Sequence, residues 1–150
     1  MTKHLRLVFP DSGEVALAAL LEGAAPETCR IIWERAPYDG ELWHAMWSGP
    51  ETYLHIDPSL RIKPENQAFH TLPGDVGFYC MDGGRLLDWP NDLAELAFFY
   101  DRGARPSFMD GPVPINIFGR IVDNLDGFEQ MCRRIHREGV KRFRVERAEP

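Results

Sequence analysis

The residues best suited to chemistry lie in one short segment, where two histidines and a tyrosine flank a Gly-Pro turn. If the turn at residues 48–51 is symmetric about its Gly-Pro bond, His44 faces His55 and Met46 faces Tyr53 on paired strands. Two imidazoles beside a phenol could serve acid–base catalysis or hold a metal. The alternative is a pair of hydrogen-bonded histidines in a barrel wall, and a one-residue slip in the turn would abolish the pairing.

Four polar residues near apolar or aromatic neighbours are further candidates for orienting a ligand: Glu51, Asn66, Gln67 and Asn116. Each also has a local structural explanation. Glu51 could serve the turn, Asn66 could cap backbone groups, and Asn116 could be an outward-facing strand residue. Both interpretations stay open from the sequence.

Aromatic residues are frequent enough to line a recognition groove. The candidates are Trp43, Trp47, Phe98, Phe99, Tyr100 and Phe118. Aromatic residues in strands equally form the core of a β-protein. The sequence alone does not separate these two roles.

Several common catalytic and metal-binding motifs are absent from the sequence. It contains no Gly-rich phosphate loop, no G-x-S-x-G motif, no H-E-x-x-H motif and no cysteine pair at zinc spacing. The cysteines Cys29, Cys80 and Cys132 are odd in number and widely spaced, so we expect no disulfide framework. We therefore expect no cofactor and no tightly bound structural metal.

Charge and length restrict the class of protein. The 150 residues suit one domain, and the net charge of −6 argues against nucleic acid as a partner. Residues 133–147 are locally basic, which predicts either a patch for an anionic ligand or a solvated helix and strand face. The absence of a long apolar run or a signal peptide predicts a soluble cytoplasmic protein without a membrane partner.

Hydrophobic periodicity predicts many strands and two helices. The expected helices are Pro26 to Arg35 and Gly127 to Glu138, the second with Asp126 as N-cap. The expected strands lie within residues 3–9, 14–21, 41–47, 52–56, 76–80 and 93–100, with a last strand around Phe143 and Val145, and a helix turn is the alternative for residues 93–100. Residues 114–126 are expected to form a strand, a turn and the start of a helix. Residues 57–75 are expected to run over the surface. The fold class is therefore mainly β, a closed antiparallel barrel with a helix capping each end.

The order of several short motifs resembles that of the cyclophilins. Residues 25–28 lead into a helix, residues 42–45 stand where cyclophilins carry Phe-His-Arg, and residues 97–99 resemble their Gln-Phe-Phe strand. Residues 114–126 resemble the closing strand of that fold. The resemblance covers most of the chain and implies a cyclophilin-like β-barrel.

The catalytic residues that the resemblance would imply are mostly replaced. Ala45 stands at the place of the arginine that polarises the prolyl amide, Ala97 replaces the glutamine, and Ile115 matches the histidine before the closing strand. Phe99 is kept. Losing one preorganised donor typically costs about 100- to 1,000-fold in rate, so we expect no competent prolyl isomerase.

A closer similarity is to a bacterial family of cyclophilin-like proteins classed as a domain of unknown function. It rests on His44 and on residues 47–51, 64–67 and 73–75. This similarity implies a fold without an assigned reaction. The function that we predict is binding or conversion of an unknown small molecule in a pocket built from the His44 hairpin, Asn66 and the wall near Phe99 and Phe118. The alternatives are a non-catalytic peptide- or protein-binding groove and a residual prolyl isomerase.

The aromatic content also predicts a homo-oligomer. Four tryptophans and nine phenylalanines exceed what two short helices can cover in a small barrel. We expect a symmetric dimer in which Trp43 and Trp47 contact the second subunit. The alternative is that the same surface is a ligand pocket closed by a loop from residues 57–75.

Overall fold

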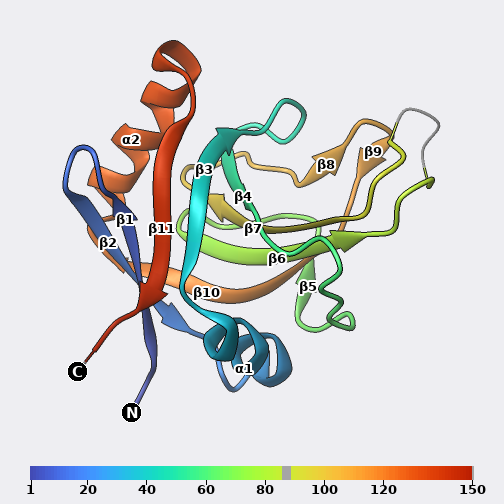
Figure 1. Cartoon of the computed structure of the whole chain (residues 1–150), viewed down its shortest axis with the longest axis horizontal. Coiled ribbons are helices and arrows are strands. Elements are labelled where there is room, and N and C mark those ends of the chain that lie inside the picture. The colour runs from blue at the N-terminus through green and yellow to red at the C-terminus, as the bar shows by residue number, and fades with distance from the viewer. Residues whose placement is uncertain (86–88, 150) are drawn as a thin grey trace.

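Strands with alternating apolar residues pair into a closed antiparallel barrel (Figure 1). The structure, a computed structural model, describes residues 1–85 and 89–149. In these ranges the barrel strands are β1 (His4–Phe9), β2 (Glu14–Leu20), β3 (Tyr38–His44), β4 (Glu51–His55), β6 (Asp75–Met81), β7 (Leu93–Phe99), β10 (Ile115–Asp123) and β11 (Lys141–Arg147). Their order around the barrel is β2-β1-β11-β3-β4-β7-β6-β10, and β10 pairs with β2 to close it. The prediction of a closed barrel is confirmed.

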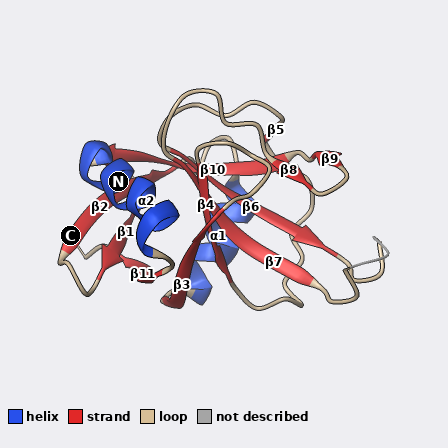
Figure 2. Ribbon diagram, turned by 90° about the horizontal axis from the view of Figure 1, so that it is seen from above, coloured by secondary structure: helices blue, strands red, loops and turns tan. Residues whose placement is uncertain are grey.

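The helices α1 (Pro26–Arg35) and α2 (Leu125–Glu138) lie at opposite ends of the barrel (Figures 1 and 2). The bounds of α1 match the prediction. The prediction for α2 is wrong at its start, because Asn124 rather than Asp126 is the N-cap. The Asn124 side chain accepts a hydrogen bond from the Gly127 N–H at 3.2 Å. Asparagine tolerates the left-handed backbone that this position requires, with φ of 61°.

The barrel interior is filled by aromatic and aliphatic side chains from the strands and from α2. Phe9, Phe98, Phe128 and Phe143 form its centre, with ring centroids 4.9 to 6.1 Å apart. Phe118 is also fully buried in this core. This packing fixes which face of each strand points inward, and therefore which residues remain on the outside.

The predicted pairing of His44 with His55 is wrong. His44 pairs with Thr52 and Trp43 pairs with Tyr53, so the register differs by three positions from the symmetric turn. An odd shift places the two histidines on opposite faces of the sheet. The turn is not a tight hairpin, because the Ser48 carbonyl accepts a hydrogen bond from the Arg105 N–H at 2.9 Å and residues 45–50 form a wider loop.

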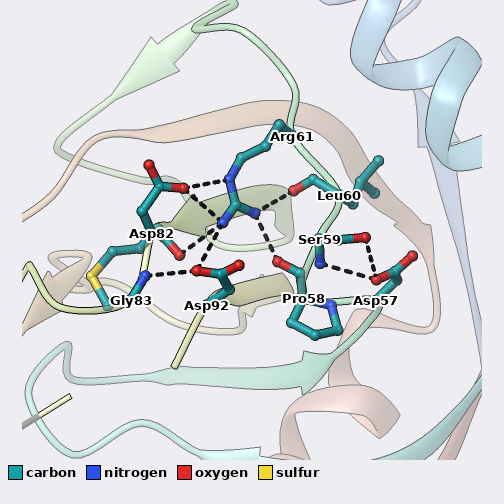
Figure 3. Close-up of polar contacts among 9 residues, drawn as sticks. Asp57, Pro58, Ser59, Leu60, Arg61, Asp82, Gly83 and Asp92 are labelled. Atoms are coloured by element: carbon teal, nitrogen blue, oxygen red, sulfur yellow. Dashed lines mark hydrogen bonds and ion pairs between the residues drawn. The ribbon is translucent and has the colours of Figure 1, made fainter. Parts of the chain in front are cut away.

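Residues 57–75 run over the surface as predicted, with β5 (Gln67–Ala68) added beside β10. Arg61 holds this segment against the β6–β7 connection (Figure 3). Its guanidinium donates to Asp82 at 2.9 Å and to the carbonyls of Pro58 and Met81, and it lies 3.8 Å from Asp92. The network gives Arg61 a structural role.

The short strands β8 (Ser107–Phe108) and β9 (Gly111–Pro112) pair with each other outside the barrel. Figure 1 shows this pair beside β7 and the loop that follows β3. The hairpin and the loop together cover part of the barrel's outer wall.

The basic segment of residues 133–147 is a solvated face rich in ion pairs. Arg134 and Lys141 both contact Glu138, and Arg142 contacts Asp11 at 3.0 Å. Arg133 pairs with Glu129 and Asp101, Arg144 pairs with Asp39 and Glu146, and Arg147 donates to carbonyls of α1. These pairs favour the solvated-face interpretation over a patch for an anionic ligand.

The described residues contain no helix with the length and apolar character that a membrane crossing requires.

Candidate functional site

The outer face of β4 and β7 presents two carboxylates. Because strand side chains alternate, Glu51, Tyr53 and His55 share the face of β4 that points away from the core. Glu95 lies on the same outer face of β7, opposite His55. Ala97 lies opposite Tyr53, so a small side chain separates the two carboxylates along the sheet.

A partly enclosed cavity of about 140 Å³ lies over these residues, and we call it the Glu51–Glu95 pocket. Its polar part contains Glu51, Glu95 and Ser48, and His55 lines it beside Tyr53. A cavity of ~150 Å³ is large enough for one benzene ring. The pocket therefore suits a small molecule, or one ring-sized part of a larger one.

Aromatic side chains from three segments form the pocket wall. Trp47 comes from the loop after β3, Phe108 from β8, and Trp89 from the stretch before β7. Phe108 lies between the two indoles, with ring centroids 5.6 Å from Trp47 and 5.3 Å from Trp89. The Trp89 Nε1–H is buried and has no hydrogen-bond partner among the described residues.

Burial dominates the electrostatics of the two carboxylates. Glu51 is only 4% exposed, and desolvation raises its pKa to about 7, opposed by the Ser48 hydroxyl. The pKa of Glu95 is raised well above its usual range by burial and further by the charge of Glu51. Neither carboxylate takes part in an ion pair within the part of the chain that the structure describes. The pair therefore tends to retain a proton near neutral pH.

Ser48 can neutralise little of this charge. Its single hydroxyl proton is also within reach of the Ser107 carbonyl, at 3.2 Å, and its oxygen accepts the Ser107 N–H at 2.9 Å. A serine hydroxyl donates only one hydrogen bond at a time. The serine therefore anchors the loop to β8 and leaves most acceptor positions on the carboxylates free.

Tyr53 and His55 complete the outer face of β4. Their rings meet edge to face with centroids 5.2 Å apart. Burial and the nearby Glu95 and Glu51 raise the pKa of Tyr53, and burial lowers the pKa of His55. A neutral imidazole, a neutral phenol and two carboxyl groups with raised pKa values can donate or accept protons near neutral pH.

His44 lies outside this pocket, on the side of β3 that faces α2. Its Nδ1 lies 2.8 Å from the Ala45 carbonyl, so Nδ1–H donates and Nε2 accepts from the Tyr100 hydroxyl at 2.7 Å. Its ring contacts His136, with centroids 3.6 Å apart. Burial lowers the pKa of His44, which matches this neutral tautomer. His44 is thus part of the contact between β3 and α2.

Asn66 and Asn116 bind backbone groups instead of lining the Glu51–Glu95 pocket. The Asn66 amide donates to the Ile117 carbonyl at 2.8 Å, and the Asn116 amide donates to the Lys63 carbonyl at 3.0 Å. The neighbouring Glu65 accepts hydrogen bonds from the first turn of α1, including Thr28 N–H at 2.8 Å. This cluster ties residues 63–66 to β10 and α1.

The remaining candidates are divided between the core and the outer surface. Phe118 is in the barrel core, whereas Phe99 belongs to a small apolar cluster outside the barrel and lies opposite Glu51. Trp43 lies opposite Tyr53 and is 45% exposed, and Trp47 is 47% exposed. The fold therefore brings together Trp47, Glu51, Tyr53 and His55 from the predicted set.

Sequence reasoning missed Glu95, Trp89, Phe108 and Ser48. Glu95 had a detectable signal, since it is the only charged residue in the apolar run of residues 93–99. A carboxylate inside a buried strand is costly unless it is paired or functional. Trp89 and Phe108 lie in irregular or very short elements and had no such signal.

A larger open groove of about 790 Å³ lies between β6 and residues 112–114, bordered by Gln67 and Asn116. Its charged residues already have partners, because Arg85 pairs with Asp110 at 2.9 Å and Asp82 pairs with Arg61. Within the described residues, no group of three or more His, Cys, Asp or Glu side chains converges as a metal site. The smaller pocket therefore has the stronger unsatisfied chemistry.

A sequence profile described as a protein of unknown function, DUF3830, matches residues 7–146. The chain belongs to the DUF3830 family. The match spans both helices and every barrel strand, apart from the residues of β1 and β11 that lie outside 7–146. A comparison with curated proteins found no match for this DUF3830 chain.

Two solved structures share the fold of the DUF3830 chain. McbB in complex with tryptophan has a TM-score of 0.71 at 20% identity, over 97% of this chain and 45% of McbB. The chain thus spans less than half of McbB. The solution structure of the hypothetical protein AF2241 from Archaeoglobus fulgidus has a TM-score of 0.60 at 23% identity, over 98% of this chain and 95% of that protein. At these identities the likeness shows the fold alone.

Proposed function

We propose that the protein binds a small organic molecule in the Glu51–Glu95 pocket, as a binding protein or as an enzyme that moves a proton on its ligand. The observation that supports this most is a pair of largely buried carboxylates that have no cationic partner within the described residues and are set among aromatic side chains. Burying such groups destabilises a fold, so their presence in a cavity favours function over stability.

The pair suits proton transfer because its protonation changes near neutral pH. A general acid or base works best when its pKa lies near the working pH. Glu51, with a pKa of about 7, meets that condition. The influence of Glu51 on Glu95 pushes the two pKa values apart, which gives one acid and one base in the same cavity.

The structural neighbour McbB supports an aromatic small molecule as one ligand class. That protein was solved in complex with tryptophan, so a protein that contains this barrel binds an aromatic amino acid. The aromatic wall of Trp47, Phe108 and Trp89 offers stacking surfaces for such a group.

We further propose that the barrel is cyclophilin-like and that the protein is cytoplasmic and has no prolyl isomerase activity. The support for the fold relation is the order of the motifs together with eight closed strands and a helix at each end. The support for lost isomerase activity is chemical. Ala45 and Ala97 line or adjoin the pocket and cannot donate a hydrogen bond to a prolyl amide.

A ligand screen tests the main proposal. Small organic molecules of about one or two rings would be screened by thermal shift against the wild type, Glu51→Gln, Glu95→Gln and the control Glu41→Gln. Glu41 is an exposed carboxylate on β3 outside the pocket. We expect hits whose stabilisation is lost in both pocket variants and kept in the control. Hits that bind all four proteins equally would place the binding site elsewhere.

Peptide binding is the second candidate, favoured by the open groove of about 790 Å³. Chemical shift changes at Tyr79 and Val113, which border that groove, would support it on titration with short proline peptides. Unchanged spectra at millimolar peptide would reject it.

A further inference from the structure

We propose that the ligand of the Glu51–Glu95 pocket carries a protonated amine on a small apolar or aromatic body. This inference rests on the proposed function and specifies its ligand class. The charge of the pocket and the chemistry of its wall support it.

The first observation is an imbalance of charge. Among the residues that the structure describes, the pocket is lined by two carboxylates and by no lysine or arginine. Elsewhere in the described chain, the arginines near acidic groups pair with them, as Arg61 does with Asp82 and Arg85 does with Asp110. A buried carboxylate normally has such a partner. An ammonium group of a ligand would supply the missing cation.

The second observation is the aromatic wall. The ring of Phe108 lies between those of Trp47 and Trp89, with its centroid 5.6 Å from the first and 5.3 Å from the second. Tyr53 contributes a further ring. Aromatic faces attract organic cations, most strongly when the site is shielded from water. Carboxylates combined with several aromatic rings suit an amine, whereas they would repel a carboxylate or phosphate ligand.

Proton exchange should accompany binding. Without a ligand, the carboxylate pair lowers its repulsion by retaining a proton. An ammonium group makes that proton unnecessary, so binding of the cation should release it. Among the described residues, the other titratable groups near the pair are Tyr53 and His55 on β4 and Tyr79, which lies opposite Glu95 on β6. The nearby cation Arg85 is held by Asp110.

Three probes of the same size test the ligand class: benzylamine, benzyl alcohol and benzoate. Each would be titrated into the wild type at about pH 8, where a primary amine is protonated. The indole N–H signals of the four tryptophans report binding. Trp47 and Trp89 should shift, while Trp33 should not, since it lies on α1 beneath Lys3 and Arg147.

We expect benzylamine to bind at least about tenfold more tightly than benzyl alcohol, and benzoate not to bind. The affinity for benzylamine should rise between about pH 6 and pH 8. It should fall in Glu51→Gln and Glu95→Gln, but not in Glu41→Gln. Equal affinity for benzylamine and benzyl alcohol would be consistent with the proposed pocket but would refute the proposal of a cationic ligand. No shift of Trp47 or Trp89 with any probe would overturn both the ligand class and the proposed pocket. Because the probe comparison uses only wild-type protein, it does not depend on how the variants fold.

Discussion

Glu51→Gln should stabilise the protein at alkaline pH. Glutamine keeps the size of the side chain and removes its ionisable proton. The pKa of Glu51 is raised from 4.5 to about 7 by burial. A shift of roughly 2.5 units corresponds to about 3 kcal/mol of unfolding free energy that the wild type loses once the carboxyl is ionised.

The sign follows from proton binding. Between about pH 4.5 and pH 7, the folded protein holds a proton on Glu51 that the unfolded chain has released. The free energy of unfolding of the wild type therefore falls as the pH rises through this window. Glu51→Gln has no ionisable group at this position, so its free energy of unfolding does not fall for this reason. The two proteins should be similarly stable near pH 4.5 and differ by about 3 kcal/mol, with the variant more stable, above about pH 8.

Urea unfolding followed by tryptophan fluorescence would measure this difference at intervals of pH. Effects of titrating groups that do not interact with Glu51 appear in both proteins and largely cancel in the comparison. Glu95 is the exception, because the variant removes the charge of Glu51 that raises its pKa, which adds to the stability of the variant at high pH. Glu41→Gln is the matched control, since Glu41 is exposed on β3, and its difference from the wild type should stay small. A difference in unfolding free energy between Glu51→Gln and the wild type that does not change with pH would refute a buried and unpaired Glu51 carboxylate. A variant that is less stable than the wild type at high pH would also refute it.

Three further outcomes are expected. The protein should show no appreciable isomerisation of a short proline peptide, because Ala45 and Ala97 cannot polarise the amide; a rate within about tenfold of an ordinary cyclophilin would contradict this. The pKa of His44, followed by NMR, should lie below ~6.5 because of burial, so the stability that depends on the neutral ring is lost as the pH falls from ~6.5 through the lower folded pKa. Titration at or above ~6.5 would contradict a buried neutral ring. Light scattering at micromolar concentration should give about twice 17.2 kDa, since Trp43 and Trp47 are 45% and 47% exposed; a monomer mass would exclude the dimer.

The candidate site was only partly predictable from the sequence. Glu51, Tyr53, His55 and Trp47 were identified because they flank a Gly-Pro turn in an aromatic segment. Glu95 was overlooked, although a lone charge in an apolar strand was a usable signal. Its relation to Glu51 depends on the pairing of β4 with β7, which no local pattern specifies.

The sequence by itself determined the elements that depend on neighbouring residues. The alternation of inward-facing and outward-facing residues determined the hairpin of β1 and β2, because each strand turns one face toward the core. Leu5 and Leu7 are buried on that face. Pro26 and the apolar spacing that follows it fixed α1, because capping and periodicity act within one or two turns.

Only the tertiary structure decided the register of β3 and β4 and the composition of the pocket. The loop of residues 45–50 takes its shape from Ser48, which binds backbone groups of Arg105 and Ser107. With the loop held in this way, the register differs by three positions from that of a symmetric turn, and His44 lies against α2. The loop also brings Trp47 against Phe108 over the two carboxylates. Such contacts join residues far apart in the chain, so their geometry is set by closure of the whole barrel rather than by local sequence.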